Sequence, residues 1–325
     1  MNSKILTVII PVYNVEDYIG DSLESLRNQT NHNFYTIFVD DCGKDKSIEI
    51  IQEYLESGKL SDAKIVSRKE NGGLSAARNS GLKEATTDYV VFLDSDDYLD
   101  CRAVEIFLDS IEKYHADVLL FDNLKVPSNQ KQTNNLSVDF MDKNDEIRRV
   151  FCENKITTTA WNKVVNRRFL ENNHIYFQEG IIHEDILWGW KLFLKTQTLA
   201  QTSEVTLYYR ERENSIMTTN FSRKNIDSLL VILEQMKDDI CLLNNKLLSG
   251  YFYSKYLEFV LKIYKCSTKV DFLYAYKELK KILRGLRVAG LSKAELISNI
   301  IVHSPRYISI RLMNILLKTK FSYIH

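Results

Sequence analysis

The chain has 325 residues, enough for two domains of ordinary size. Its 43 Lys and Arg residues equal its 43 Asp and Glu residues, which excludes a polycation that binds nucleic acid along its whole length, and its 45% apolar content is that of a globular protein. The charge is uneven: residues 220–325 hold 18 Lys and Arg against 8 Asp and Glu, whereas residues 1–219 hold 25 against 35, which predicts two parts with different surroundings.

The first 122 residues alternate between two kinds of segment. Apolar runs bounded by turn residues predict strands, at residues 5–12, 34–41, 63–67, 89–94 and 116–122. Apolar residues at helical spacing predict helices between them, at residues 15–29, 45–57, 74–85 and 101–114. Strand–helix units repeated in this way predict a Rossmann-like α/β fold, in which a mainly parallel sheet is flanked by helices.

The pattern changes after residue 122. Residues 123–145 are polar and rich in Asn, and they predict a long loop or an irregular hairpin. Further on, the spacing predicts a helix over 183–196 and a strand over 203–212. From Asn220 onward the segments are long and helical in spacing. We therefore expect a first domain over 1–219 and an appended C-terminal helical domain over 220–325.

Acidic residues follow several of the predicted strands. Asp40 and Asp41 end the second strand, and the fourth runs into Asp94, Ser95, Asp96 and Asp97. Ligands of parallel sheets bind beyond the carboxyl ends of the strands, so we expect these acids to gather at one functional edge.

The acids at 94–97 have two interpretations. One Asp is explained by capping the next helix, but three acids in four positions repel one another and raise each other's pKa. A divalent cation removes this repulsion, and Mg²⁺ or Mn²⁺ commonly takes one or two carboxylates together with substrate phosphates. We favour the metal interpretation.

A glycine turn precedes the third predicted helix. Gly72 and Gly73 permit a backbone turn with positive φ, and Arg78 follows one turn into the helix. Such turns often bind phosphate, although the pattern alone is weakly specific and an arginine on a helix is usually just solvated.

Four motifs together resemble the signature of family 2 glycosyltransferases with the GT-A fold; in chain order they are VIIPVYN, VDDCGKDKS, ENGGLSAARNSGL and FLDSDDYL. The resemblance is close over roughly the first 100 residues and continues to about residue 216. It implies an inverting enzyme of the type that builds bacterial surface polysaccharides or glycoproteins, moving a hexose from UDP-Glc, UDP-Gal, UDP-GlcNAc or UDP-GalNAc to a glycan hydroxyl. It also implies that residues 1–122 bind the nucleotide-sugar and that residues 123–219 bind the acceptor and supply the base.

The resemblance also implies site residues. It places the nucleotide-sugar at Pro11, Tyr13, Glu16, Asp40, Asp41, Arg78, Asp94, Ser95 and Asp96. Of these, Asp41 would bind the uracil edge, and Asp96 with Asp94 would hold Mn²⁺ or Mg²⁺. The sequence departs from the family at Cys42–Gly43, where relatives usually have Gly-Ser, so that turn lacks the serine hydroxyl.

An inverting transfer needs a base for the incoming hydroxyl. His183, Glu184 and Asp185 begin a predicted helix, and the family places a Glu-Asp pair there. We expect Asp185 to be the base and Glu184 to bind or position the acceptor. Helix capping is the alternative for either acid, and His183 is an alternative base.

Two later segments resemble parts of the same family. In AWNKVV, Trp161 could stack on a sugar or lie in the core, and Asn162 and Lys163 could donate to hydroxyls or phosphate. In YYRERENSIM, Arg212 and Ser215 are candidates to close over the diphosphate, with Arg210 as an alternative.

The remaining features concern partners and location. Five scattered cysteines without a CxxC pair favour a reducing cytoplasm. The C-terminal residues Arg306, Arg311, Lys318 and Lys320 would suit peripheral contact with the inner face of the plasma membrane, near a lipid-linked or protein-linked glycan acceptor, or simple packing of the helical domain. The tyrosine-rich segment 248–266 would suit a homodimer surface or a surface that binds an acceptor protein. The alternatives to a transferase are a non-catalytic nucleotide-sugar-binding relative and a nucleotidyltransferase.

Overall fold

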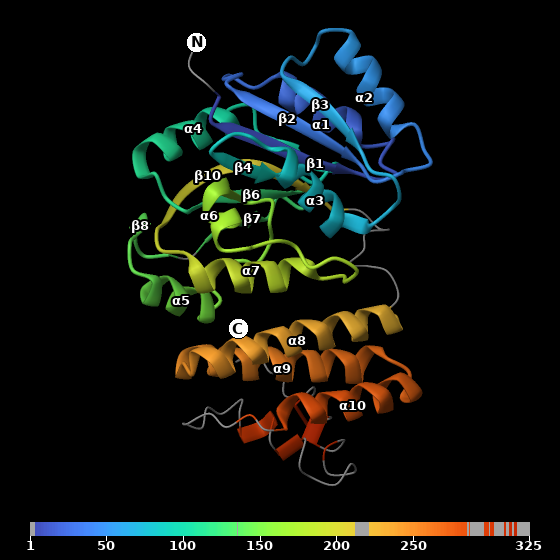
Figure 1. Cartoon of the computed structure of the whole chain (residues 1–325), viewed down its shortest axis with the longest axis vertical. Helices are drawn as coiled ribbons and strands as arrows, with labels where there is room; N and C mark the ends of the chain where they lie inside the picture. Colours follow the sequence, from blue (N-terminus) through green and yellow to red (C-terminus); the bar gives the residue numbers. More distant parts are fainter. Residues whose placement is uncertain are drawn as a thin grey trace. The chain divides into compact units, whose positions relative to one another are not determined.

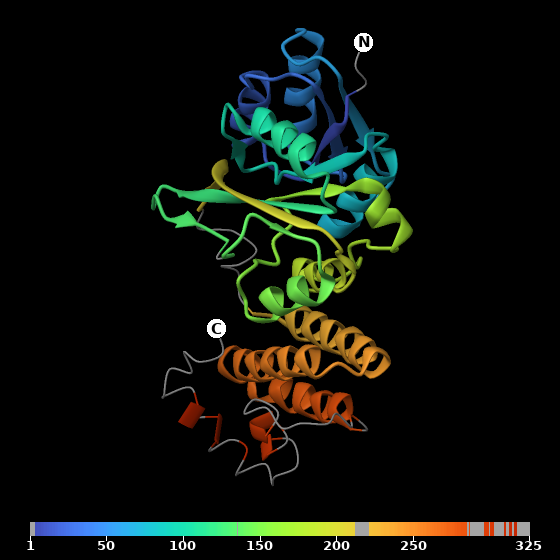
Figure 2. The ribbon, with the colours of Figure 1, turned by 90° about the vertical axis from the view of Figure 1, so that its left-hand side faces the viewer.

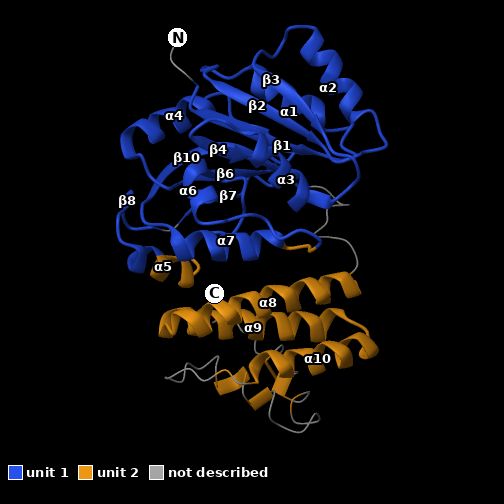
Figure 3. Cartoon of the chain, in the orientation of Figure 1, with its two compact units in different colours: residues 1–147, 155–180, 184–218 blue, residues 148–154, 181–183, 219–325 orange. Residues whose placement is uncertain are grey.

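The computed structural model describes residues 4–134, 136–211, 221–284 and 286, and short stretches at 296–298, 300–301, 309, 312–313 and 315–316. The chain divides into two compact units (Figure 3). Unit 1 comprises residues 1–147, 155–180 and 184–218, and unit 2 comprises residues 148–154, 181–183 and 219–325. Each unit is described by itself below.

Unit 1 is an α/β structure (Figure 1). Its strands are β1 (Leu6–Val12), β2 (Phe34–Asp40), β3 (Ala63–Ser67), β4 (Tyr89–Phe92), β5 (Tyr98–Leu99), β6 (Val118–Val126), β7 (Lys131–Gln132), β8 (Phe140–Met141), β9 (Lys163–Asn166) and β10 (Leu199–Arg210). Its helices are α1 (Ile19–Arg27), α2 (Ser47–Glu56), α3 (Gly73–Glu84), α4 (Ala103–Tyr114), α6 (Arg167–Asn172) and α7 (Glu184–Lys195). Helix α5 (Asn144–Cys152) begins in unit 1, and its later residues belong to unit 2.

The strands form one mixed sheet in the order β3-β2-β1-β4-β9-β6-β10-β5, with β7 paired to β6 and β8 paired to β10. Parallel pairs join β3, β2, β1 and β4, and another parallel pair joins β6 to β10. Strand β9 lies antiparallel between β4 and β6. The predicted α/β fold with a mainly parallel sheet is confirmed, since β1, β2 and β4 end at the same edge.

Strand β9 of the sheet was not predicted, whereas the segment after residue 122 takes one of its two predicted forms. Strand β9 arises from the short run KVVN, which carries too few residues for its period to identify it as a strand. The polar segment after residue 122 was predicted to be a long loop or an irregular hairpin. It is a hairpin, because β6 extends to Val126 and pairs back with β7.

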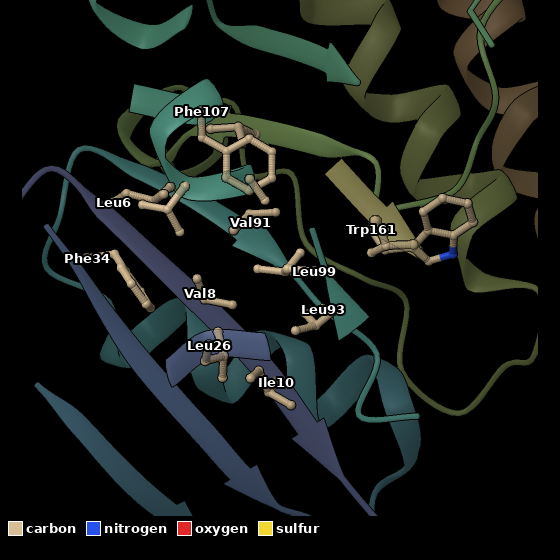
Figure 4. Packing of buried hydrophobic residues seen from close by; sticks show 14 of the residues in the cluster. Leu6, Val8, Ile10, Leu26, Phe34, Val91, Leu93, Leu99, Phe107 and Trp161 are labelled. Atoms are coloured by element: carbon tan, nitrogen blue, oxygen red, sulfur yellow. The ribbon is translucent and has the colours of Figure 1, made fainter. Parts of the chain in front are cut away.

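A hydrophobic core lies between the sheet and the helices α1, α2 and α4, and Figure 4 shows part of its packing. Alternate residues of β1 point into it, namely Leu6, Val8, Ile10 and Val12. They meet apolar residues of α1 and α4 at helical spacing, among them Leu26 and Phe107. The complete burial of β1 follows from coverage on both faces.

The opposite face of the sheet carries α3 and α7. Helix α3 packs closely on β1, because Gly81 lies so near Ile9 that an added Cβ would clash with its Cγ2. Helix α7 packs through Trp188, whose ring meets Phe92 of β4 edge-on at 6.1 Å. This face therefore brings the starts of α3 and α7 to the edge where β1, β2 and β4 end.

Unit 2 contains three long helices, α8 (Arg223–Leu243), α9 (Lys246–Cys266) and α10 (Lys269–Leu283), which pack on one another (Figure 2). Their ends are capped by polar side chains: Asn245 accepts from the first amides of α9, and Thr268 accepts from Asp271 in α10. Buried tyrosines fill the interior, and the hydroxyl of Tyr256 donates to the Leu279 carbonyl at 3.1 Å.

Among the described helices, none is both long enough and apolar enough to cross a membrane. The four basic residues singled out near the C-terminus, Arg306, Arg311, Lys318 and Lys320, lie outside the described residues.

Candidate active site

The predicted acids lie at one edge of the sheet. Strand β1 is in parallel register with both β2 and β4, so Asp40 at the end of β2, Asp41 after it and the turn 94–97 after β4 flank the end of β1. Beyond β1, Pro11 is buried in the strand, whereas Tyr13 is 48% exposed and Glu16 is exposed. The exposed side chains at this edge are therefore available to a ligand.

Asp41 holds the glycine turn that starts α3. Its carboxylate oxygens accept from the amides of Gly72 and Gly73 at 3.0 and 2.8 Å, and Arg68 Nε lies 2.9 Å from Oδ1. Gly73 has φ +80°, in the left-handed region that favours glycine. In this structure the carboxylate is thus engaged within the protein, and its contact with a uracil edge stays a prediction.

Asp40 and Glu16 also make local contacts. Asp40 Oδ1 accepts from the amide of Cys42 at 2.9 Å, and Glu16 Oε2 accepts from the amide of Lys46 at 2.9 Å. At the place where the family usually has Gly-Ser, Cys42 has φ +59° and its Sγ lies 3.2 Å from the Arg68 carbonyl. These contacts order the loop between β2 and α2.

The centre of the site is the guanidinium of Arg78, on α3. Its Nη1 lies 2.9 Å from Glu184 Oε1 and 2.9 Å from Asp185 Oδ1, and its Nη2 lies 2.8 Å from Asp94 Oδ1. The side chain of Arg78 is only 1% exposed. Arg78 therefore joins the turn after β4 to the first two residues of α7. Three of the predicted site residues, Asp94, Glu184 and Asp185, thus lie around another one, Arg78.

This arrangement determines the protonation of the groups. Burial by itself would lower the pKa of Arg78, but Asp94, Asp185 and Glu184 outweigh it and raise that pKa. Burial, with repulsion from Asp185, raises the pKa of Glu184 to about 7, and Arg78 opposes the rise. Burial also raises the pKa of Asp185, against the attraction of Arg78. Asp185 keeps 22% of its side chain exposed, so it can reach a ligand.

Sequence reasoning did not assign a role to Asp97 and offered Arg210 only as an alternative. Asp97 is buried, and its Oδ1 accepts from the amide of Arg210 at 2.8 Å. Arg210 Nε donates to the Asp96 carbonyl at 3.0 Å, and its Nη2 pairs with Asp21 at 2.5 Å. The end of β10 is thus fastened to the acidic turn. In the sequence, the only indication of this contact is Asp97, the third acid of the run DSDD.

The acidic turn suits a divalent cation. Asp94 and Asp96 are half-buried and offer hard oxygen atoms, while Ser95 is buried. Burial raises the pKa of Asp97 well above its ordinary value, and repulsion from Asp94 and Asp96 adds to the rise, so the carboxyls of this turn disfavour one another's ionisation. Among the described residues, no three His, Cys, Asp or Glu side chains form a ready-made metal site. Mn²⁺ or Mg²⁺ would therefore complete its coordination with groups other than these side chains, such as phosphate oxygens.

The polar side chains around residue 162 make contacts within the protein. The Nζ of Lys163 donates to the carbonyls of Thr157 and Thr159 at 2.9 and 2.6 Å and to Asn162 Oδ1 at 2.7 Å. Asn162 in turn donates to Thr157 Oγ1 at 2.9 Å. All three donors of the ammonium are thus used in bracing this loop, and a contact of Asn162 or Lys163 with a ligand stays a prediction.

Trp161 follows the core alternative. It is 7% exposed and belongs to the hydrophobic core (Figure 4). Its ring stacks on that of Tyr209, with the centroids 5.6 Å apart. Its ring is thus covered by protein, which leaves little area for stacking on a sugar.

The remaining candidates are His183, Arg212 and Ser215. His183 has φ +63° immediately before α7, and burial lowers its pKa to about 4, with a further lowering by Lys262. It is therefore neutral at pH 7, and its Nε2 lies 3.5 Å from Asn225. Arg212 and Ser215 lie outside the described residues.

Comparison with known proteins places this geometry in context. The sequence model of glycosyl transferase family 2 matches residues 7–173. The chain is 30% identical over 263 residues to glycosyltransferase GlyA of Streptococcus pneumoniae, covering 78% of this chain and 36% of GlyA. It is 30% identical over 222 residues to poly(ribitol-phosphate) β-N-acetylglucosaminyltransferase TarS of Staphylococcus aureus, covering 66% of this chain and 37% of TarS. The chain thus spans little more than a third of the length of these two relatives.

Solved structures share the fold. Residues 1–349 of S. aureus TarS, in complex with UDP-GlcNAc, superpose with a TM-score of 0.72 at 22% identity, covering 97% of this chain and 92% of that chain. The mannosyltransferase PcManGT of Pyrobaculum calidifontis, in complex with GDP-Man and Mn²⁺, gives a TM-score of 0.57 at 15% identity, covering 96% and 85%.

Proposed function

Because the chain belongs to glycosyl transferase family 2, we propose that it moves a hexose from a UDP-sugar to a hydroxyl of a bacterial cell-surface polymer, with inversion at the anomeric carbon. One observation carries the proposal: Arg78 holds an acid of the turn after β4 and the two acids that begin α7 in one cluster. A transferase that displaces a nucleoside diphosphate needs these two kinds of acid within one site, one near the leaving group and one near the acceptor.

The proposed donor is a UDP-sugar, with UDP-GlcNAc as the first to test. TarS, which shares the fold of this chain, has been solved with UDP-GlcNAc, and its name gives N-acetylglucosamine as the sugar transferred. Tyr13 and Glu16 at the end of β1, and Asp40 and Asp41 after β2, are proposed to line the nucleotide pocket.

Asp185 is proposed to accept the proton of the acceptor hydroxyl. As that proton leaves, the acceptor oxygen forms a bond to the anomeric carbon, and the bond from that carbon to the UDP oxygen breaks. The charge of Arg78 opposes the effect of burial on the pKa of Asp185, and so favours the ionised form that can act as base. Glu184, whose pKa is about 7, is proposed to orient the acceptor.

Asp96 and Asp94 are proposed to hold Mn²⁺ or Mg²⁺. Such an ion, when bound, stabilises the negative charge that builds on the departing diphosphate. Arg210 and Asp97 would then keep the acidic turn in place, since they fasten it to the end of β10.

The acceptor is proposed to be a lipid-linked or protein-linked polymer. Two relatives are named for cell-surface polymers: TarS for poly(ribitol-phosphate), and GgaB of Bacillus subtilis, 39% identical over 114 residues, for minor teichoic acid biosynthesis. Peripheral attachment to a membrane stays a proposal, because the C-terminal residues on which it depends are not described. Formation of a homodimer also stays a proposal, and Tyr251, Tyr253 and Tyr256 would not line it, because they are buried in the folded chain.

The test is release of UDP by the purified chain in the presence of Mn²⁺ and a short poly(ribitol phosphate) acceptor. UDP-GlcNAc, UDP-GalNAc, UDP-Glc and UDP-Gal are supplied one at a time, with GDP-mannose as the control from another nucleotide class. We expect turnover with one UDP-sugar and little with GDP-mannose. Turnover of GDP-mannose alone would refute the choice of nucleotide.

Binding and product analysis separate the remaining alternatives. A non-catalytic relative would bind UDP in a calorimetric titration without releasing it from any donor. A nucleotidyltransferase would release pyrophosphate or a sugar phosphate in place of UDP. Family membership favours the transferase over both.

A further inference from the structure

We propose that Arg78 is a positioning residue that holds the base-bearing start of α7 against the metal-binding turn after β4, and that it does not contact the sugar donor. The inference deepens the proposed function and rests on it for the roles of Asp185 and Asp94. It changes the role that the sequence motif implied for Arg78, which was contact with the nucleotide and its phosphates.

The polar contacts connect three separate elements. Arg78 extends from α3, Asp94 follows β4, and Glu184 and Asp185 begin α7. All three contacts are between 2.8 and 2.9 Å, and two of them use the same nitrogen, Nη1. A planar guanidinium fixes the directions of its N–H groups, so it also fixes where the carboxylates lie relative to one another.

A cluster of three aromatic rings packs against the guanidinium, with the ring of Phe177 nearest to it. The guanidinium carbon of Arg78 lies 5.0 Å from the ring centroid of Phe177. That ring stacks on Trp188 of α7 at 4.9 Å and 7°, and it meets Phe92 of β4 edge-on at 5.2 Å. The aromatic cluster therefore joins α7 to β4, the same two elements that the polar contacts join.

The next residue of α3 fixes this support. Asn79 Nδ2 donates to the Phe177 carbonyl at 2.9 Å, and Asn79 Oδ1 accepts from the Phe177 amide at 2.9 Å. A reciprocal pair of this kind fixes both the position and the direction of the backbone at Phe177. Two adjacent residues of α3 thus hold the carboxylates and the ring beneath them.

The environment of Arg78 argues against a donor contact. The side chain is 1% exposed, and three of its N–H groups, two on Nη1 and one on Nη2, already donate to carboxylates. To reach a phosphate the guanidinium would have to leave these buried carboxylates unpaired, which is costly.

Function depends on this spacing because the base must face the sugar from the side opposite the leaving group. If the start of α7 moves relative to the turn after β4, Asp185 no longer lies in line with the bond that breaks. A displacement of about 1 Å between reacting groups can lower a rate about 100-fold without weakening ground-state binding.

The test compares Arg78→Lys with Arg27→Lys, a control on α1 where the arginine side chain is 47% exposed. Lysine keeps the charge but lacks the planar fork. We expect kcat of Arg78→Lys to fall about 100-fold, whereas the Kd for UDP with Mn²⁺ changes less than about threefold. We expect Arg27→Lys to match the wild type in both.

Two outcomes would overturn the inference. Loss of UDP affinity as large as the loss of kcat would show that Arg78 contacts the donor, and unchanged kcat would show that it positions nothing. If Arg78→Lys does not fold, Phe177→Leu takes its place, because it removes the aromatic support and retains an apolar side chain. The same division between a lower kcat and an unchanged Kd is expected, and an unchanged kcat again counts against the inference.

A second measurement does not depend on turnover. The unfolding of Arg78→Met, Asp185→Asn and the double variant is followed in urea with the full chain. The double variant should be less destabilised than the sum of the two single variants, since each removes the same contact. Strict additivity would contradict the bridge. If the wild type turns over no UDP-sugar, the proposed function fails, while this cycle and the UDP titration still decide the role of Arg78.

Discussion

Two buried cations of unit 1, Arg78 and Lys163, have opposite surroundings. Arg78 faces three carboxylates, and their attraction raises its pKa despite burial. Lys163 donates to three uncharged oxygen atoms, and burial lowers its pKa to about 7, with only a partial correction from the charge of Asp185. Arg78 therefore keeps its charge at every physiological pH, whereas Lys163 can lose its proton.

The difference indicates different roles. A fixed charge among carboxylates can orient them for chemistry, and its contacts lie where Asp185 remains partly exposed. An ammonium surrounded by carbonyls satisfies acceptors that would otherwise be buried unpaired, which is a contribution to stability. Variants should thus divide into those that change activity around Arg78 and those that change stability around Lys163.

The largest expected effect is that of Asp185→Asn on turnover. Loss of a general base lowers rates by about 10²–10⁴-fold, while UDP affinity should stay near that of the wild type. The measurement is kcat together with a calorimetric titration of UDP. Asp109→Asn, an exposed acid on α4, is the control. Turnover within a few-fold of the wild type would show that Asp185 is not the base. The contacts of Arg78 would then have no role in activity to set against the stabilising role of Lys163.

The second effect is the loss of metal dependence in Asp96→Asn. Removal of one carboxylate should lower turnover by at least about 100-fold, and Mn²⁺ should no longer increase UDP affinity. The matched control is Asp88→Asn, an exposed acid that precedes the same strand, β4. UDP affinity that still rises with Mn²⁺ in Asp96→Asn would assign the metal to other ligands.

Much of the fold was predictable because it depends on long, regular patterns. The apolar run of β1 and the helical stripes of α1, α2 and α4 repeat over enough residues to identify both the element and its buried face. Strand β9 was not predictable, since four residues carry no usable period and its antiparallel place is set by its neighbours. Tertiary pairing, rather than local preference, makes it a strand.

The candidate site was predictable in its residue types and less so in its contacts. The motifs named Asp94, Glu184, Asp185 and Arg78 as site residues, and in the structure these four side chains, far apart in sequence, lie together. The motifs did not reveal that Lys163 turns inward, because the direction of a long side chain depends on nearby acceptors such as the Thr157 carbonyl. A motif shows which residue type occurs at a position. It does not distinguish a residue that contacts a ligand from one that makes contacts within the protein.

The third effect is on stability and concerns Lys163→Met. Loss of the ammonium leaves buried carbonyls of Thr157 and Thr159 unpaired, which should lower the free energy of unfolding by about 2–3 kcal/mol. The measurement is urea unfolding, with the exposed Lys69→Met as control. Turnover of the folded variant at a permissive temperature should stay within a few-fold of the wild type. If Lys163→Met is as stable as the wild type but inactive, Lys163 acts in function and not in stability.

The same variant predicts a pH dependence. The pKa of Lys163 is about 7 in the folded chain, and an unfolded lysine has a pKa of about 10.4. Between these values the unfolded state binds the extra proton, so the contribution of Lys163 to stability rises with pH, by up to about 1.4 kcal/mol per unit. The destabilisation by Lys163→Met should therefore be larger at pH 9 than at pH 7. Equal destabilisation at both values would mean that Lys163 keeps its proton.

The smallest effect tests whether the place of Arg78 depends on close packing of α3. In Gly81→Ala the new methyl group meets Ile9 and Val39, so α3 must move away from the sheet at a cost of about 1–3 kcal/mol in unfolding free energy. Gly20→Ala on α1 meets no atom within 4 Å and should gain about 0.5–1 kcal/mol from helix propensity. Both values come from urea unfolding. If α3 moves, Arg78 moves with it, and kcat should fall several-fold in Gly81→Ala alone. A destabilised Gly81→Ala with unchanged kcat would mean that the contacts of Arg78 with Asp94 and Asp185 hold its position without help from the helix.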